Sequence, residues 1–238
     1  YAAPVLDPTG KTNLTGVIDI STAMYSSYGI SGYGELISWG YNGNGELADN
    51  GTSNKVLPNY PTTINNIVKI IPSSYSTVAL KADGTVWSWG WNAYGQLANG
   101  TTTSSSAPVQ MKADSSTYMT NVMDVGSTGG SFSAITRDNK VYAVGGNYLG
   151  LLGDNTTSNR SYFTEVKAMY GKDIEDKIVR LSRSMARTDS STDISVQYYI
   201  REDGSILGTG KNTSYQLFGE MTTALNSAKE MNPTYLEI

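Results

Sequence analysis

Short runs of alternating apolar and polar residues recur along the chain, and most of them end at Gly, Asp or Asn. The segment "TVALKADGTVWSWG" (77–90) contains two such runs, one on each side of Asp83-Gly84. Alternation of this kind indicates half-buried strands. Asp-Gly between two such runs is a strong hairpin signal, because the mirror-image hairpin turns need positive φ. The segment therefore predicts a strand, a tight turn and a second strand.

The same hairpin pattern occurs four times. Residues 133–145 and 197–210 repeat it around Asp138-Asn139 and Asp203-Gly204, and Tyr33-Gly34 marks the corresponding turn nearest the N-terminus. An apolar tetrad precedes each hairpin, at 17–20, 67–70, 122–125 and 178–181. The tetrad starts 23 residues before the Gly that ends the hairpin in three copies, and 32 residues before it in the fourth. The nine additional residues (187–195) are expected to form a surface loop insertion.

A second repeated string lies at the end of each hairpin. "LISWGYNGNGEL" (36–47) matches "VWSWGWNAYGQL" (86–97), and residues 141–152 and 206–217 match more weakly. The shared positions are Trp39, Gly40, Asn42, Trp89, Gly90, Asn92, Gly145, Asn147, Gly210 and Asn212. We expect each Gly to sit where backbones approach closely or φ is positive, and each Asn to bond its own loop. Trp39 and Trp89 are expected to fill the gap between adjacent sheets.

Extended segments containing Pro form a third landmark. They lie at 2–5, 59–62, 106–109 and 231–234, and residues 162–166 are a version without Pro. Five such segments accompany four hairpins, so the pattern predicts one surplus strand at the ends of the chain. A short helical turn is expected within the tail, residues 222–234.

Together these landmarks predict an all-β fold: a β-propeller, or a partial propeller arc, of four-stranded antiparallel blades in four repeats. One repeat of 50 to 65 residues cannot bury both faces of its sheet, whereas neighbouring repeats can bury each other. We expect one domain over 1–238, with repeats at about 17–66, 67–121, 122–177 and 178–238. Residues 1–16 would be the end of a preceding or shared blade.

The composition argues against several kinds of functional site. The net charge is −4 and the Lys and Arg residues are scattered, so we expect no binding to nucleic acid. The chain has no Cys and no His, which removes thiolate sites and the commonest general base and metal ligand. No apolar run approaches the roughly 20 residues of a membrane helix, so no membrane insertion is expected. We expect no catalytic residue, no metal and no cofactor.

At this point the residues resemble a known family. The order "ALKADGTVWSWGWNAYGQLANGT" (79–101) is similar to the repeat of the regulator of chromosome condensation family. The resemblance covers nearly the whole chain and is strongest in the first two repeats. It implies a β-propeller, usually of seven blades. Some members are guanine nucleotide exchange factors for a small GTPase, and many bacterial members are secreted binding proteins, including a propeller-type inhibitor of β-lactamases.

Four repeats do not close seven blades, and three arrangements remain open. The chain is a segment of a longer propeller, a ring of four or five broad blades, or an open arc whose ends pair with another chain. An unpaired edge strand at either end would invite such pairing.

The aromatic residues of the loops are the candidate binding residues. Tyr41, Trp91, Tyr94, Tyr148 and Tyr215 lie in the string after the hairpins, at positions that differ between repeats. Tyr and Trp in loops supply rigid contact area for a partner, and packing between blades is the alternative role.

The function predicted from these features is non-catalytic binding of another protein or of copies of the chain itself. The composition, rich in Ser, Thr, Asn and Tyr, favours an extracellular or cell-surface setting in a bacterium. The alternative is a self-assembling surface fibre or layer subunit that uses the surplus end strands. An exchange factor for a small GTPase is less favoured, because the chain is acidic. An enzyme with Tyr or Lys chemistry has no support.

Overall fold

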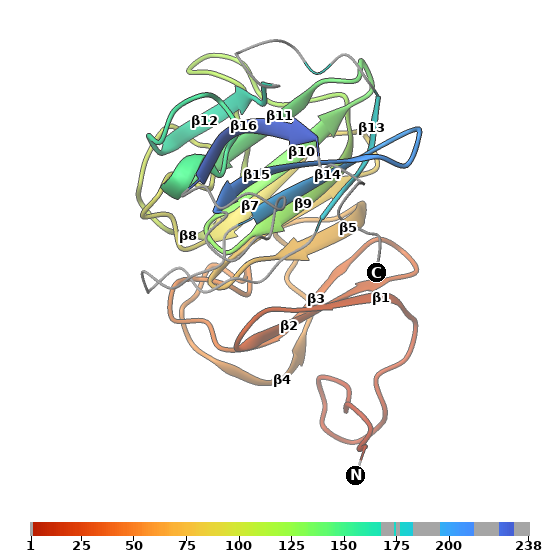
Figure 1. Ribbon diagram of the computed structural model, residues 1–238. Helices are drawn as coiled ribbons and strands as arrows, with labels where there is room; N and C mark the ends of the chain where they lie inside the picture. Colours follow the sequence, from red (N-terminus) through yellow and green to blue (C-terminus); the bar gives the residue numbers. More distant parts are fainter. Residues whose placement is uncertain (1, 168–173, 175–176, 183–195, 212–223, 231–238) are drawn as a thin grey trace.

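The computed structural model describes residues 2–167, 174, 177–182, 196–211 and 224–230, and it is built almost entirely from strands (Figure 1). In these residues, four antiparallel four-stranded sheets follow one another along the chain, each made of four consecutive strands. We call them blades one to four. The predicted all-β fold of four-stranded blades is confirmed. In the described part, no helix has the length and apolar character needed to cross a membrane.

The strand bounds follow the repeats. Blade one contains β1 (Val17–Thr22), β2 (Ser26–Ser31), β3 (Leu36–Gly40) and β4 (Lys55–Asn59). Blade two contains β5 (Ile67–Pro72), β6 (Ser76–Lys81), β7 (Val86–Gly90) and β8 (Ser105–Gln110). Blade three contains β9 (Val122–Thr128), β10 (Ser131–Thr136), β11 (Val141–Gly145) and β12 (Arg160–Glu165), with the 3₁₀ turn η1 (Tyr148–Gly150) after β11. Blade four contains β13 (Ile178–Leu181), β14 (Val196–Arg201), β15 (Ile206–Lys211) and β16 (Ala224–Glu230).

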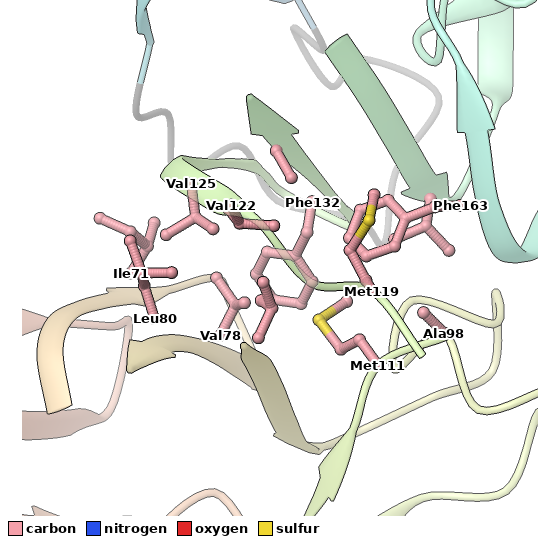
Figure 2. Close-up of a cluster of buried hydrophobic side chains, with 13 residues drawn as sticks. Ile71, Val78, Leu80, Ala98, Met111, Met119, Val122, Val125, Phe132 and Phe163 are labelled. Carbon is pink, nitrogen blue, oxygen red and sulfur yellow. The ribbon is translucent and has the colours of Figure 1, made fainter. Parts of the chain in front are cut away.

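The hydrophobic core lies between the blades. The first strands of consecutive blades are neighbours, since β1 contacts β5, β5 contacts β9, and β9 contacts β13. A separate apolar cluster fills each gap between consecutive blades. Figure 2 shows the cluster between blades two and three, where Ile71, Val78 and Leu80 face Val122, Val125 and Phe132. Each blade is therefore stabilised mainly by its neighbours, as expected for stacked repeats.

The hairpin turns differ from the predicted mirror-image type. In blade two the closing bond runs from the Lys81 N–H to the Thr85 carbonyl, so the loop contains three residues. Of these only Gly84 has positive φ, at +80°. This is the hairpin in which an ordinary turn is followed by one left-handed residue. Asp83 instead accepts hydrogen bonds from the backbone and hydroxyl of Thr85.

The outer strands correct the prediction about the Pro segments. Pro58 lies in β4 and Pro108 in β8, 50 residues apart, so the equivalent segment in repeat one is 55–59 and not 59–62. Residues 2–5 form no strand; the only pairing of the N-terminal segment within the described residues is an isolated bridge between Leu6 and Asn13. The predicted surplus strand at this end is therefore wrong. Residues 231–234 and the insertion at 187–195 lie outside the described residues.

The tail also differs from the prediction. Residues 224–230 form strand β16, which pairs antiparallel with β15, and not a helical turn. The strand completes blade four with the same strand order as the other three blades. The regular repeat, rather than local helix propensity, decides the conformation of this segment.

In blades one to three, one Asn holds together the loop that follows the third strand. The Asn147 side chain donates to the carbonyls of Thr156 and Ser158, at 3.2 and 3.1 Å, and accepts from the Leu152 N–H at 2.8 Å. Asn42 and Asn92 make the same bonds in blades one and two. A buried side-chain amide thus replaces the backbone pairing that a loop lacks. Asn212 lies outside the described residues.

The loop of blade three also contains a nearly buried carboxylate that should make it acid-sensitive. Burial raises the pKa of Asp154, but hydrogen bonds from Thr156, Arg160 and Asn147 outweigh burial and lower the pKa below its usual value. Because the folded-state pKa is lowered, the stabilisation is present above the unfolded pKa and is lost as pH falls through the folded one.

We therefore expect Asp154→Asn to reduce the free energy of unfolding by about 1–2 kcal/mol at neutral pH, with a smaller reduction below about pH 4. Urea denaturation of both proteins at neutral and acidic pH measures this difference. Asn99 occupies the equivalent position in repeat two, so the substitution is compatible with the loop. A difference that does not change with pH would contradict the assignment.

Candidate functional site

Five aromatic side chains form a continuous row at one end of blades one and two, and we call them the aromatic strip: Tyr25, Tyr41, Tyr75, Trp91 and Tyr94. The ring centroids of consecutive members lie 6.2, 6.2, 6.5 and 5.0 Å apart, counted along the chain of contacts Tyr41, Tyr25, Tyr75, Trp91, Tyr94. Three of the four contacts are edge-to-face. These separations lie in the range in which aromatic pairs attract each other.

The backbone of each blade places two of these rings side by side. The Trp91 N–H donates to the Tyr75 carbonyl at 2.8 Å, which joins the end of β7 to the residue before β6. Gly90 makes this approach possible, because its φ is +97° and a Cβ there would lie 2.4 Å from the same carbonyl oxygen. Blade one repeats the arrangement, with the Tyr41 N–H donating to the Tyr25 carbonyl at 2.9 Å.

The strip ends at blade three. The equivalent bond there runs from the Gly146 N–H to the Gly130 carbonyl at 2.9 Å, so both aromatic positions are occupied by Gly. The Tyr94 ring lies against Gly146, where a Cβ would be 3.3 Å from Tyr94 Cδ2. The repeated backbone therefore continues into blade three, but the aromatic surface does not.

The aromatic strip offers a partly exposed apolar surface with polar hydroxyls. Tyr25 is 58% exposed and Tyr41 38% exposed, whereas Tyr75, Trp91 and Tyr94 are partly buried against their neighbours. Rings held on both sides lose little conformational freedom when a partner binds. The arrangement is suited to contact with a macromolecular surface.

The structure brings together three of the five aromatic residues proposed from the sequence: Tyr41, Trp91 and Tyr94. Tyr148 is exposed on η1, and no ring contact joins it to the strip within the described residues. Tyr215 lies outside the described residues. Sequence reasoning missed Tyr25 and Tyr75. The sequence does contain a signal for them. They lie 50 residues apart, each one residue before the second strand of its blade (β2 or β6), so they hold the same position in two successive repeats.

The residue before the hairpin-ending Gly contacts the preceding blade in blades two and four. Trp89 is fully buried, and its indole N–H donates to the Glu46 carbonyl of blade one at 2.6 Å. Thr209 occupies the same position in blade four, and its hydroxyl donates to the Leu151 carbonyl of blade three at 2.8 Å. Trp39, at this position in blade one, is partly exposed and belongs to none of the apolar clusters between blades, so the prediction that it fills a gap between sheets is wrong. The same hydrogen bond to a carbonyl of the preceding blade thus occurs in blades two and four.

No catalytic constellation is evident in the described residues. They contain no group of three or more acidic side chains that could hold a metal ion. Burial raises the pKa of Glu46, against hydrogen bonds donated by Asn44 that lower it. This carboxylate accepts from the Asn44 N–H at 2.8 Å and from its side-chain amide at 2.7 Å. Glu46 therefore closes its own loop.

The repeat has a known counterpart. Residues 83–135, from the β6–β7 turn to strand β10, match the family model described as the regulator of chromosome condensation (RCC1) repeat. This part of the chain is therefore similar to an RCC1 repeat. No curated protein matches the sequence.

Solved structures show the same fold at low sequence identity. Human WBSCR16 is 17% identical with a TM-score of 0.73, over 91% of this chain and 53% of that one. Prp20p of Saccharomyces cerevisiae is 14% identical with a TM-score of 0.73, over 97% of this chain and 53% of that one. Yeast RCC1 (Prp20) bound to Kap60 is 16% identical with a TM-score of 0.69, over 91% and 50%. The chain spans about half the length of these structures.

Proposed function

We propose that this RCC1-type chain is a non-catalytic binding protein that captures a protein partner through the aromatic strip. The strip itself is the observation that carries the proposal: five contacting rings, two of them exposed, run across two blades. Clustered Tyr and Trp side chains supply most of the binding energy in many interfaces between proteins.

The similar structures support a protein as the partner. Prp20p has binding properties towards Gsp1p and histones, and yeast RCC1 is known in complex with Kap60. Gsp1p, histones and Kap60 are partners of those proteins. At 14–16% identity, the comparison supports a protein as the kind of partner of this chain, but not any particular protein. Exchange activity on a small GTPase stays a prediction of the family resemblance.

An extracellular or cell-surface setting in a bacterium is part of the proposal. It rests on composition: 16% charged residues, no Cys, and a polar surface supplied largely by Ser, Thr, Asn and Tyr. Antibody detection on intact and lysed cells of the source organism would test it, and signal only after lysis would contradict it.

The binding role of the strip can be tested with peptides selected from a phage-displayed library against the wild-type chain. We expect the double substitution Trp91→Ala and Tyr94→Ala to weaken binding of most selected peptides at least about tenfold, since truncating a central aromatic anchor commonly costs 2 kcal/mol or more. Biolayer interferometry on the immobilised proteins measures the change.

Tyr33→Ala is the matched control, because Tyr33 is an exposed aromatic residue at the β2–β3 turn, outside the strip. We expect it to leave peptide binding unchanged. Both variants should keep the wild-type unfolding temperature within a few degrees. Peptides that bind the double variant as tightly as the wild type would remove the strip as the binding surface.

A further inference from the structure

Four Asn residues of the chain are followed directly by Gly: Asn42, Asn44, Asn50 and Asn99. In such a pair the backbone nitrogen of the Gly can attack the carboxamide carbon of the Asn, because Gly has no side chain to obstruct the approach and the widest backbone freedom. The attack closes a succinimide ring. Its rate in a folded protein depends on whether the carboxamide and the following nitrogen are free to turn towards each other.

The structure holds three of these four side chains in place. Asn42 is fully buried, and its carboxamide donates to three oxygens at 3.0, 3.2 and 3.2 Å. The Asn44 carboxamide donates to the Glu46 carboxylate at 2.7 Å. The Asn99 carboxamide oxygen accepts from the N–H and the hydroxyl of Thr101 at 3.0 and 2.8 Å. Each of the three must break these bonds before it can reach the nitrogen of the next residue.

Asn50 is the free member of the set. It is exposed in the loop that follows β3, and its carboxamide makes no hydrogen bond within the described residues. The Gly51 N–H belongs to no strand ladder and donates to the Asp49 carboxylate at 3.0 Å. Movement of this nitrogen towards the Asn50 carboxamide therefore breaks one bond to a side chain and disturbs no strand.

Blade three contains the same loop with one decisive difference. Asn155 holds the place of Asn50: both are exposed, with φ of +61° and +62°. In both loops the next N–H donates to the preceding Asp at 3.0 Å. The residue after Asn155, however, is Thr156, whose β-branched side chain stiffens the backbone and crowds its nitrogen. The two loops thus differ in the one residue that decides whether the ring can close.

We propose that Asn50–Gly51 is a site of spontaneous modification, at which the folded chain converts Asn50 into a mixture of aspartate and isoaspartate. The Gly51 nitrogen forms a bond to the side-chain carbon of Asn50. The proton of the Gly51 N–H passes through solvent to the carboxamide nitrogen, which leaves as ammonia. Water then opens the succinimide at one of its two carbonyls, and the choice of carbonyl gives aspartate or isoaspartate. Water is the only other reactant.

The modification changes a contact between blades one and two. The Asn50 N–H donates to the Ser106 carbonyl of β8 at 3.2 Å. Both products place a new carboxylate beside Asp49, which is paired with Lys55 at 3.3 Å. Isoaspartate also adds one carbon to the main chain before Gly51. We therefore expect the modified chain to unfold at a lower temperature than the unmodified chain. The proposal does not depend on partner binding by the aromatic strip.

Peptide mapping by mass spectrometry tests the proposal on the 238-residue chain, kept folded in warm, mildly alkaline buffer. We expect Asn50 to lose its amide at least about tenfold faster than Asn42, Asn44 and Asn99, because the hydrogen bonds of those three add to their barriers. In concentrated urea, where the bonds are absent, the four residues should react at similar rates. Methylation by an isoaspartyl methyltransferase identifies the isoaspartate product.

Exchange of one residue between the two loops is the matched test. Gly51→Thr gives blade one the residue of blade three and should slow the loss of the Asn50 amide at least about tenfold. The loop accepts a side chain there, since the nearest atom to a Cβ at Gly51 is an Asp49 carboxylate oxygen at 3.2 Å, the end of a side chain. Thr156→Gly makes the reciprocal change, and Asn155 should then lose its amide.

Four results would overturn the proposal. They are an Asn50 amide that outlasts that of Asn44 or Asn99 in the folded chain, an equal preference for Asn50 in urea, an Asn155 that reacts as fast as Asn50 in the wild type, and a folded Gly51→Thr variant that reacts like the wild type. Circular dichroism of each variant establishes that it is folded before its rates are interpreted.

Discussion

Trp89→Ala is expected to lower the free energy of unfolding by about 3–5 kcal/mol, the range for removing a large buried aromatic residue. The indole is fully buried in the cluster between blades one and two, next to Ile70 and Ala79. Its N–H is also the donor of the bond to the Glu46 carbonyl. The substitution would leave both a cavity and a buried acceptor without that donor. Because most single domains are stable by only about 5–15 kcal/mol, this loss would be a large share of the total.

Urea denaturation followed by tryptophan fluorescence and circular dichroism measures the effect. Trp39→Ala is the matched control, since Trp39 has the same place in repeat one but is partly exposed. We expect a smaller loss there, of about 1–2 kcal/mol, because less apolar surface is buried. Equal losses for the two substitutions would contradict the view that contacts between successive blades stabilise the fold.

Gly90→Ala is expected to lower the free energy of unfolding by about 2–5 kcal/mol although it adds only one methyl group. Two effects add: the positive φ of +97° strains any residue with a Cβ, by about 1–2 kcal/mol, and the new methyl would overlap the Tyr75 carbonyl, by about 1–3 kcal/mol. The carbonyl cannot move away easily, because the adjacent Ser76 pairs with Gly90 in the ladder between β6 and β7. Relief of the overlap would therefore separate these strands at the aromatic strip.

The control separates the two effects. Gly204 also has positive φ, +88°, but a Cβ there would meet nothing within 4 Å. Gly204→Ala should therefore cost only the backbone strain of about 1–2 kcal/mol. Denaturation curves of both variants give the comparison. If the two glycines proved equally tolerant of alanine, the close approach at Gly90 would not constrain the fold, and the placement of Tyr75 beside Trp91 would need another explanation.

The strands and turns of the blades were predictable because the sequence patterns that indicate them extend over only a few neighbouring residues. Alternation marks the strands, and Asp-Gly marks the turns. The type of turn was not readable: Asp83-Gly84 suits a two-residue turn as well as the three-residue loop observed, and only the strand register distinguishes them. The Pro segments were misaligned for a similar reason. Pro58 and Pro61 are only three residues apart, and the register with β3 selects the first of them for the strand.

The candidate site was only partly predictable. Tyr41, Trp91 and Tyr94 belong to a string that can be aligned, so they were found in the sequence. Tyr25 and Tyr75 lie before the hairpins, 16 residues ahead of Tyr41 and Trp91, and only the bond across the strand ends shows that they are neighbours. A contact between rings in different blades, such as Tyr25 and Tyr75, depends on how the sheets stack.

The sequence by itself determined the unit of this protein, a strand–turn–strand repeat that becomes four antiparallel blades, because propensity and alternation are local properties of the chain. The tertiary structure alone decided which surfaces are covered. Ile20 and Ile70 hold the same place in similar apolar strands, yet one is exposed and the other buried. Burial of an apolar side chain depends on whether another blade lies against it, and that is a property of the assembled arc rather than of any single repeat.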